Sequence, residues 1–218
     1  MKRLSILILM ILLTELAWAA CTPERMVMIE FRDATASMLQ GSANPPLEEG
    51  SFASKPKVLY RYGDQYGRLE EAPDPENGIH ALVIVNKRDA WQINRFDGRI
   101  RHIVDPDPDG KFLAPVFGRP DGPDLLNEYE FGCEMEFMKS RGIEPETVMA
   151  VDRELETYSF SEGIYDITLV VDPDDQLPVI SMLYVNKELD TFMKYLSYVI
   201  YRVPDLTMFA PPDTGEED

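Results

Sequence analysis

Short runs of apolar or alternating residues recur along the chain, and turn residues separate them. The runs cover residues 58–62, 66–71, 79–85, 91–95, 100–104, 156–160, 164–171, 179–185 and 192–201. Runs of strand length that follow one another at about ten-residue intervals are typical of an antiparallel meander. The Asp97-Gly98 pair between two of the runs is a strong signal for a β-hairpin.

Helix signals are few. Residues 133–141 give the best one, and Gly142 is a suitable stop for that helix. Residues 187–201 also fit a helix, but their alternation and their content of Tyr and Val favour a strand. Residues 26–33 alternate like a strand, although Pro23 follows Thr22 as it does at many helix starts. For residues 23–39, strand and helix therefore both stay open.

Several of the predicted strands are apolar on both faces. In residues 81–85, Leu82 and Ile84 point to one side and Val83 and Val85 to the other. An antiparallel sheet with one solvent-exposed face would carry polar residues at alternate positions of its strands. Either both faces are covered by other parts of the protein, or one face lines an apolar cavity.

The first 21 residues have the form of a secretory signal. Lys2 and Arg3 precede an apolar stretch, residues 4–13, which is too short to span a bilayer. Two endings remain open. Ala17-Trp18-Ala19 fits ordinary signal peptidase and would release a soluble chain, whereas Ala19-Ala20-Cys21 resembles the end of a lipobox. Trp18 stands where a lipobox usually carries an aliphatic residue, so soluble release into the periplasm or cell envelope is favoured over a lipid anchor.

The chain has two cysteines, Cys21 and Cys133. If Cys21 is not lipidated, an oxidising compartment would permit a disulfide between them. The alternative is that Cys133 is a buried, unpaired thiol that packs as a small apolar side chain.

The formal charge of −18 changes the list of expected partners. Such an acidic chain repels phosphate backbones, so we expect no nucleic-acid partner. Anionic headgroups should repel it as well, so membrane contact is expected only through a lipid anchor on Cys21. Residues 213–218 hold no apolar side chain and are expected to be a disordered acidic tail.

The sequence offers little for catalysis. It has no Gly-x-Ser-x-Gly elbow and no phosphate-binding glycine loop, and its two histidines, His80 and His102, are expected in strands. Residues 105–110 match the first half of a calcium loop, but Val116 stands where that loop requires Glu. We therefore expect no enzyme, no cofactor and no metal site, and a secreted hydrolase is only a remote alternative.

The order and spacing of several short motifs resemble a known family. The motifs are Tyr60-Arg61-Tyr62-Gly63, Gly67-Arg68-Leu69-Glu70-Glu71, residues 82–86, residues 89–94, residues 165–173, Leu177-Pro178 and Met208-Phe209-Ala210-Pro211-Pro212. Together they are similar to the periplasmic lipoprotein-sorting superfamily of LolA- and LolB-like proteins with RseB-type relatives. The likeness covers roughly residues 57–212, after a signal peptide at 1–20 and an N-terminal segment at 21–56.

The resemblance implies a mainly β (α+β) fold. Its strongly curved antiparallel sheet would form an incomplete β-barrel, with a few helices plugging or covering the concave face. Such a cavity would bind a lipid or the acyl chains of a lipoprotein. One departure is that residues 26–33 alternate like a strand, whereas lipoprotein carriers have a long N-terminal helix. The residues expected to line the cavity are Tyr60, Tyr62, Leu82, Ile84, Trp91, Ile93, Leu169, Val171, Met182 and Tyr184. The alternative on the same fold is an interaction or sensor module for envelope proteins, with its cavity filled by its own side chains.

Overall fold

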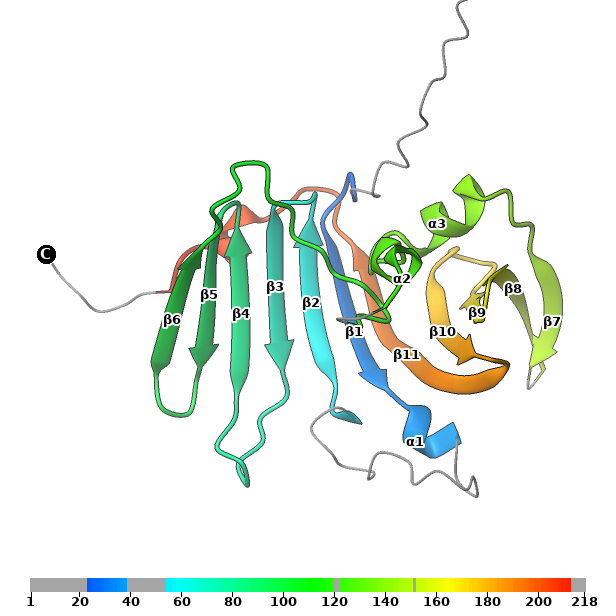
Figure 1. Ribbon diagram of the computed structural model, residues 1–218, viewed down its shortest axis with the longest axis horizontal. Coiled ribbons are helices and arrows are strands. Elements are labelled where there is room, and N and C mark those ends of the chain that lie inside the picture. Colours follow the sequence, from blue (N-terminus) through cyan, green and yellow to red (C-terminus); the bar gives the residue numbers. More distant parts are fainter. Residues whose placement is uncertain (1–22, 39–53, 120–121, 151, 213–218) are drawn as a thin grey trace, which may run out of the picture.

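A single antiparallel sheet of 11 strands dominates the computed structural model, which describes residues 23–38, 54–119, 122–150 and 152–212 (Figure 1). The strand order is β6-β5-β4-β3-β2-β1-β11-β10-β9-β8-β7. The first six strands are β1 (Val27–Asp33), β2 (Lys57–Tyr62), β3 (Tyr66–Glu71), β4 (Ala81–Asn86), β5 (Asp89–Asn94) and β6 (Arg99–Val104). The others are β7 (Glu146–Ala150), β8 (Arg153–Glu162), β9 (Tyr165–Val171), β10 (Pro178–Val185) and β11 (Glu188–Ile200).

The helices in the described part of the chain are short. They are α1 (Thr35–Met38), α2 (Asp124–Glu128), α3 (Glu134–Ser140) and the 3-10 helix η2 (Leu206–Phe209). The mainly β prediction is therefore confirmed, as are the strand near 187–201 and the helix within 133–141. Of the two alternatives for residues 23–39, the structure shows the strand at 27–33, and the four-residue helix α1 follows it at 35–38. The predicted signal peptide, Cys21 and the acidic tail lie outside the described residues.

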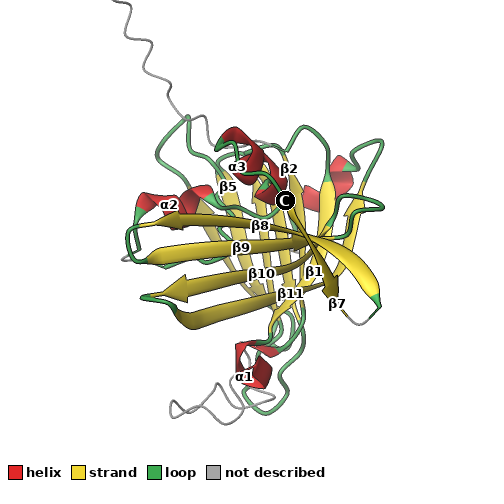
Figure 2. Ribbon diagram, turned by 90° about the vertical axis from the view of Figure 1, so that its right-hand side faces the viewer, coloured by secondary structure: helices red, strands yellow, loops and turns green. Residues whose placement is uncertain are grey.

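The sheet consists of two meanders that meet at β1 and β11. These two strands run antiparallel, with Val27 opposite Ile200 and Asp33 opposite Met193. The sheet is not closed, because β6 and β7 stand at opposite ends of the strand order. In Figure 1 the end that holds β7 to β11 bends round α2 and α3, and Figure 2 shows β8 to β11 crossing in front of the first meander.

One face of the sheet packs against residues 112–119 and 122–140, which include α2 and α3 and which we call the covering segment. Ile29 and Leu59 of the sheet share a core there with Leu126 and Met138 of the two helices. The ring of Phe112 lies so close to Gly67 on β3 that a Cβ at residue 67 would come within 2.4 Å of it. This covering segment therefore closes the face over β1 to β3 and leaves β4 to β6 beyond it.

The other face of the first meander is covered by the C-terminal segment. Phe209 of η2 is fully buried against Leu82 and Ile84. Arg68 donates a hydrogen bond to the carbonyl of Met208 (3.0 Å), and Asn86 donates one to the carbonyl of Phe209 (3.1 Å). The face of β4 that carries Leu82 and Ile84, the outer face of the first meander, is thus covered and belongs to a hydrophobic core.

Candidate functional site

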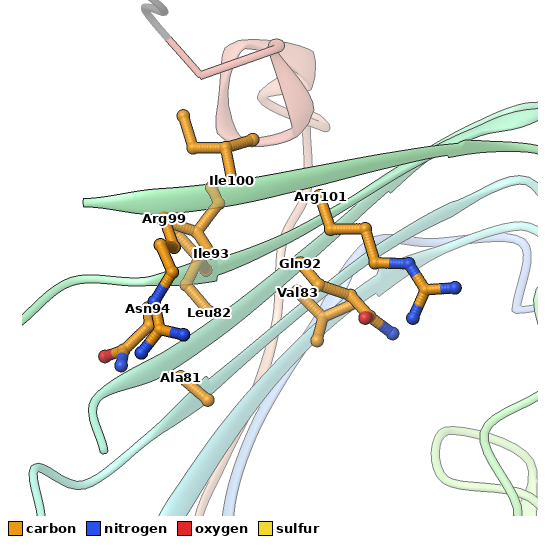
Figure 3. Close-up of a pocket in the computed structure, with 9 residues that line it drawn as sticks. All are labelled: Ala81, Leu82, Val83, Gln92, Ile93, Asn94, Arg99, Ile100 and Arg101. Carbon is orange, nitrogen blue, oxygen red and sulfur yellow. The ribbon is translucent and has the colours of Figure 1, made fainter. Parts of the chain in front are cut away.

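A pocket of about 500 Å³ lies on the end of the sheet formed by β4, β5 and β6. Its lining residues come from all three strands: Ala81, Leu82, Val83, Gln92, Ile93, Asn94, Arg99, Ile100 and Arg101 (Figure 3). A pocket with this volume is within the range of small-molecule sites, about 300–1,000 Å³.

Strand register decides which side chains face the pocket. Side chains opposite one another in neighbouring strands share a face of the sheet. One such row crosses six strands and consists of Ile29, Leu59, Leu69, Val83, Gln92 and Arg101. Ile29 and Leu59 are buried in the core, Val83 is half-buried, and Gln92 and Arg101 are exposed. The pocket is therefore the uncovered continuation of the face that carries α2 and α3.

The polar side chains of the pocket differ in their hydrogen-bond and ion-pair partners. Asn94 binds the neighbouring backbone: its Oδ1 accepts from the N–H groups of His80 and Phe96, and its Nδ2 donates to the carbonyl of Gly78. Arg99 pairs with Asp97 in the turn before β6. Within the part of the chain that the structure describes, the side chains of Gln92 and Arg101 have no hydrogen-bond or ion-pair partner.

The interior beside the second meander is filled. Leu169 and Val171 are fully buried there, among side chains that include Phe137 and Met138 of α3. The two-sided apolar pattern thus has two origins. Most of it is covered core, and β4 to β6 leave part of an apolar face open.

The ten residues expected to line one cavity are not brought together. Six of them lie in the cluster under η2, on the outer face of the first meander: Tyr60, Tyr62, Leu82, Ile84, Trp91 and Ile93. Leu82 and Ile93 also touch the pocket. Leu169 and Val171 lie in the filled interior, and Met182 and Tyr184 are half-buried on the opposite face of the second meander.

Sequence reasoning missed the pocket's remaining residues, which are Ala81, Val83, Gln92, Asn94, Arg99, Ile100 and Arg101. The sequence did contain a signal for Gln92 and Arg101. The Asp97-Gly98 hairpin pairs β5 with β6 and so places Gln92 opposite Arg101. That pairing sets two polar side chains beside the small apolar residues of β4.

A buried ion pair links the covering segment to the sheet. Nη2 of Arg61 on β2 lies 2.9 Å from Oε2 of Glu130, and each side chain is 1% exposed. Arg61 also donates to the carbonyl of Phe131 (2.8 Å), and Glu130 accepts from the backbone N–H of Ala114 (2.9 Å). Burial raises the pKa of Glu130 and lowers that of Arg61, and their mutual attraction opposes both shifts.

A second buried carboxylate, Glu134, joins α3 to β11. It accepts hydrogen bonds from the hydroxyl of Tyr195 (2.8 Å) and from the backbone N–H of Gly132 (2.9 Å). The network continues from Tyr195 to Ser181 and from Ser181 to Tyr129. Burial raises the pKa of Glu134 to about 7, against the opposing effect of these hydrogen bonds.

Cys133 and His102 are not among the residues that line the pocket. Cys133 is disulfide-bonded, and Cys21, the other cysteine of the sequence, lies outside the described residues. His102 contacts Asp89 (2.7 Å) and stacks on Trp91. Across residues 23–38, 54–119, 122–150 and 152–212, no cluster of three or more potential metal ligands is found.

The loop that resembled half of a calcium site is built of turns. Asp105 accepts a hydrogen bond from the backbone N–H of Asp107, and Asp107 accepts one from that of Asp109, both at 2.9 Å. These carboxylates thus stabilise the local backbone of the loop.

No family model and no curated protein matches the sequence. Among solved structures, the fold is similar to an uncharacterised conserved protein from Thermus thermophilus. That match has 9% identity and a TM-score of 0.47, and it covers 87% of this chain and 86% of that one. PNGF-II is similar at 8% identity and a TM-score of 0.31, over 86% of this chain and 30% of that protein.

None of the helices described here has the length and apolar content needed to cross a membrane.

Proposed function

We propose that this chain is an exported, non-enzymatic protein of the outer-membrane lipoprotein-sorting type. It binds a lipid, or an acyl chain of a lipoprotein, in the pocket between β4 and β6. The observation that carries the proposal is the pocket's position on the uncovered continuation of an apolar sheet face. Ala81 and Val83 provide its apolar floor, and each methylene of a chain buried there would contribute about 0.8 kcal/mol.

The proposed architecture is the incomplete β-barrel of LolA- and LolB-like proteins. The unclosed sheet and the packing of α2 and α3 on one of its faces support this interpretation. In such a protein the helices would fill one half of the concave face, and the ligand would bind in the other half.

The filled interior favours a second candidate function. Leu126, Phe137 and Met138 occupy the space beside the second meander where a carrier would hold most of its ligand. A sensor or interaction module for envelope proteins would need no further cavity. Lipid binding at β4 to β6 distinguishes the two functions, because the module would bind none.

Replacing Val83 with glutamate is expected to abolish binding of a fluorescent long-chain fatty acid. The substitution places a charge on the apolar floor, where an acyl chain would have to bury it. The measurement is a fluorescence titration of the folded wild-type and variant proteins.

Val148→Glu is the matched control, because Val148 is exposed on β7 at the far end of the sheet. It should bind the probe as the wild type does. Absence of binding by the wild-type protein, together with the absence of co-purified lipid in native mass spectrometry, would overturn the carrier proposal and leave the interaction module.

The proposed export is supported by the disulfide state of Cys133, since disulfides persist in oxidising compartments. We further propose that its partner is Cys21, which would exclude a lipid thioether on that sulfur. The intact mass of mature protein from its own cell envelope should then match cleavage after Ala19. It should lie two hydrogen masses below the reduced chain. A mass increased by an acylated glyceryl group on Cys21 would contradict this prediction.

A further inference from the structure

We propose that the ligand of the β4–β6 pocket is a long-chain carboxylic acid, and that Arg101 binds its carboxylate with help from Gln92. This inference rests on the proposed function and adds the ligand's charge and the residue that selects it. Arg101 and Gln92 are direct cross-strand partners, and their side chains lie on the same face as Val83 (Figure 3).

The charges around the pocket differ from those of the chain as a whole. The sequence carries 39 Asp and Glu residues and a formal charge of −18. None of the nine lining residues is acidic, and two of them, Arg99 and Arg101, are cationic. On a chain that repels anions in general, this is a place where an anion can meet an uncompensated positive charge.

Arg101 is the better candidate of these two arginines. Asp97 already holds Arg99 through an ion pair and two hydrogen bonds in the preceding turn. Arg101 makes no ion pair within the described residues. Its planar guanidinium can donate two parallel hydrogen bonds to a carboxylate. The amide of Gln92, which also lacks a partner in the described part of the chain, can donate a third.

The lining of the pocket suits an acyl chain with a charged head. The floor of Ala81 and Val83 would contact such a chain while its head lies at Arg101. The arrangement therefore favours a ligand with an apolar chain and a carboxylate head.

The test compares dodecanoate with dodecanol, which share a chain and differ in the charge of the head. Calorimetry at neutral pH would measure both ligands on the wild type and on Arg101→Gln. The wild type should bind the acid up to about fivefold more tightly than the alcohol, the upper end expected for an exposed ion pair. Arg101→Gln should lose this preference and bind the alcohol unchanged.

Two further variants complete the test. Arg32→Gln changes the net charge equally at an exposed position of β1 and should keep the preference. Arg101→Lys should restore part of it. If the wild type binds acid and alcohol equally, or if Arg101→Gln keeps the preference, the inference fails while the proposed function stands. If neither ligand binds the wild type, both fail.

Discussion

Replacing Arg61 with methionine is expected to lower the free energy of unfolding by about 3–5 kcal/mol, the usual effect of breaking a buried ion pair on one side. Arg61 and Glu130 are both almost completely buried, and the variant leaves the carboxylate of Glu130 without its cation. Oε1 of Glu130 has no hydrogen-bond partner among the residues that the structure describes, so the carboxylate has little other compensation. Urea unfolding followed by circular dichroism measures the change.

The control for this prediction is Arg95→Met. Arg95 pairs with Glu70 at 3.5 Å on the surface, and losing that pair should cost less than about 1 kcal/mol. The double variant Arg61→Met/Glu130→Gln should be more stable than Arg61→Met alone, because no unpaired charge remains. Equal losses in Arg61→Met and Arg95→Met would show that the buried pair does not hold the covering segment on the sheet.

The second prediction concerns Glu134, whose burial should make the protein less stable as pH rises from about 4.5 to 7. The pKa of Glu134 is raised from 4.5 to about 7 in the folded state. A carboxyl with a raised folded-state pKa contributes stability below its unfolded pKa and loses it as pH rises through the folded value. The expected loss is about 3 kcal/mol over this window, at 1.36 kcal/mol per pKa unit.

Unfolding free energies of wild type and Glu134→Gln at several pH values test this prediction. The difference between the two proteins isolates Glu134 from the many other carboxylates of the chain. Glu134→Gln should gain stability relative to the wild type as pH rises. Its amide oxygen can still accept from the backbone N–H of Gly132, and its amide nitrogen can donate to the hydroxyl of Tyr195. Glu136→Gln is the matched control, since Glu136 is exposed on the same helix. A wild-type minus Glu134→Gln difference that does not vary with pH would contradict the assignment.

Most of the strands could be predicted because their signals are local. Alternation and turn residues such as Asp97-Gly98 are visible within a dozen residues, and β5 and β6 follow from them. Strand β7 was missed because all its residues are exposed, so no buried face gives it a pattern. Helix α2 was missed because its five residues are too few for helical periodicity to appear.

The arrangement of the candidate site could be predicted only in part, because it depends on which segments cover each face. The alternation in β4 showed two apolar faces, but only the structure shows that Phe209 covers Leu82 and Ile84. The segment that covers this face lies more than 100 residues further along the chain, and no local sequence pattern encodes that contact. Tyr60 and Trp91 were therefore placed at a ligand, whereas they pack in the cluster under η2.

The pairing of β1 with β11 also constrains the order in which the sheet can assemble. Each meander can form from local hairpins, but β1 gains its second neighbour only when β11, the last strand in the sequence, has also formed. Until then β1 presents a bare edge, and unpaired edges are where strands of other chains can add. Contacts between such distant segments also slow folding. A partly folded chain is therefore exposed to aggregation at β1 until β11 has paired with it.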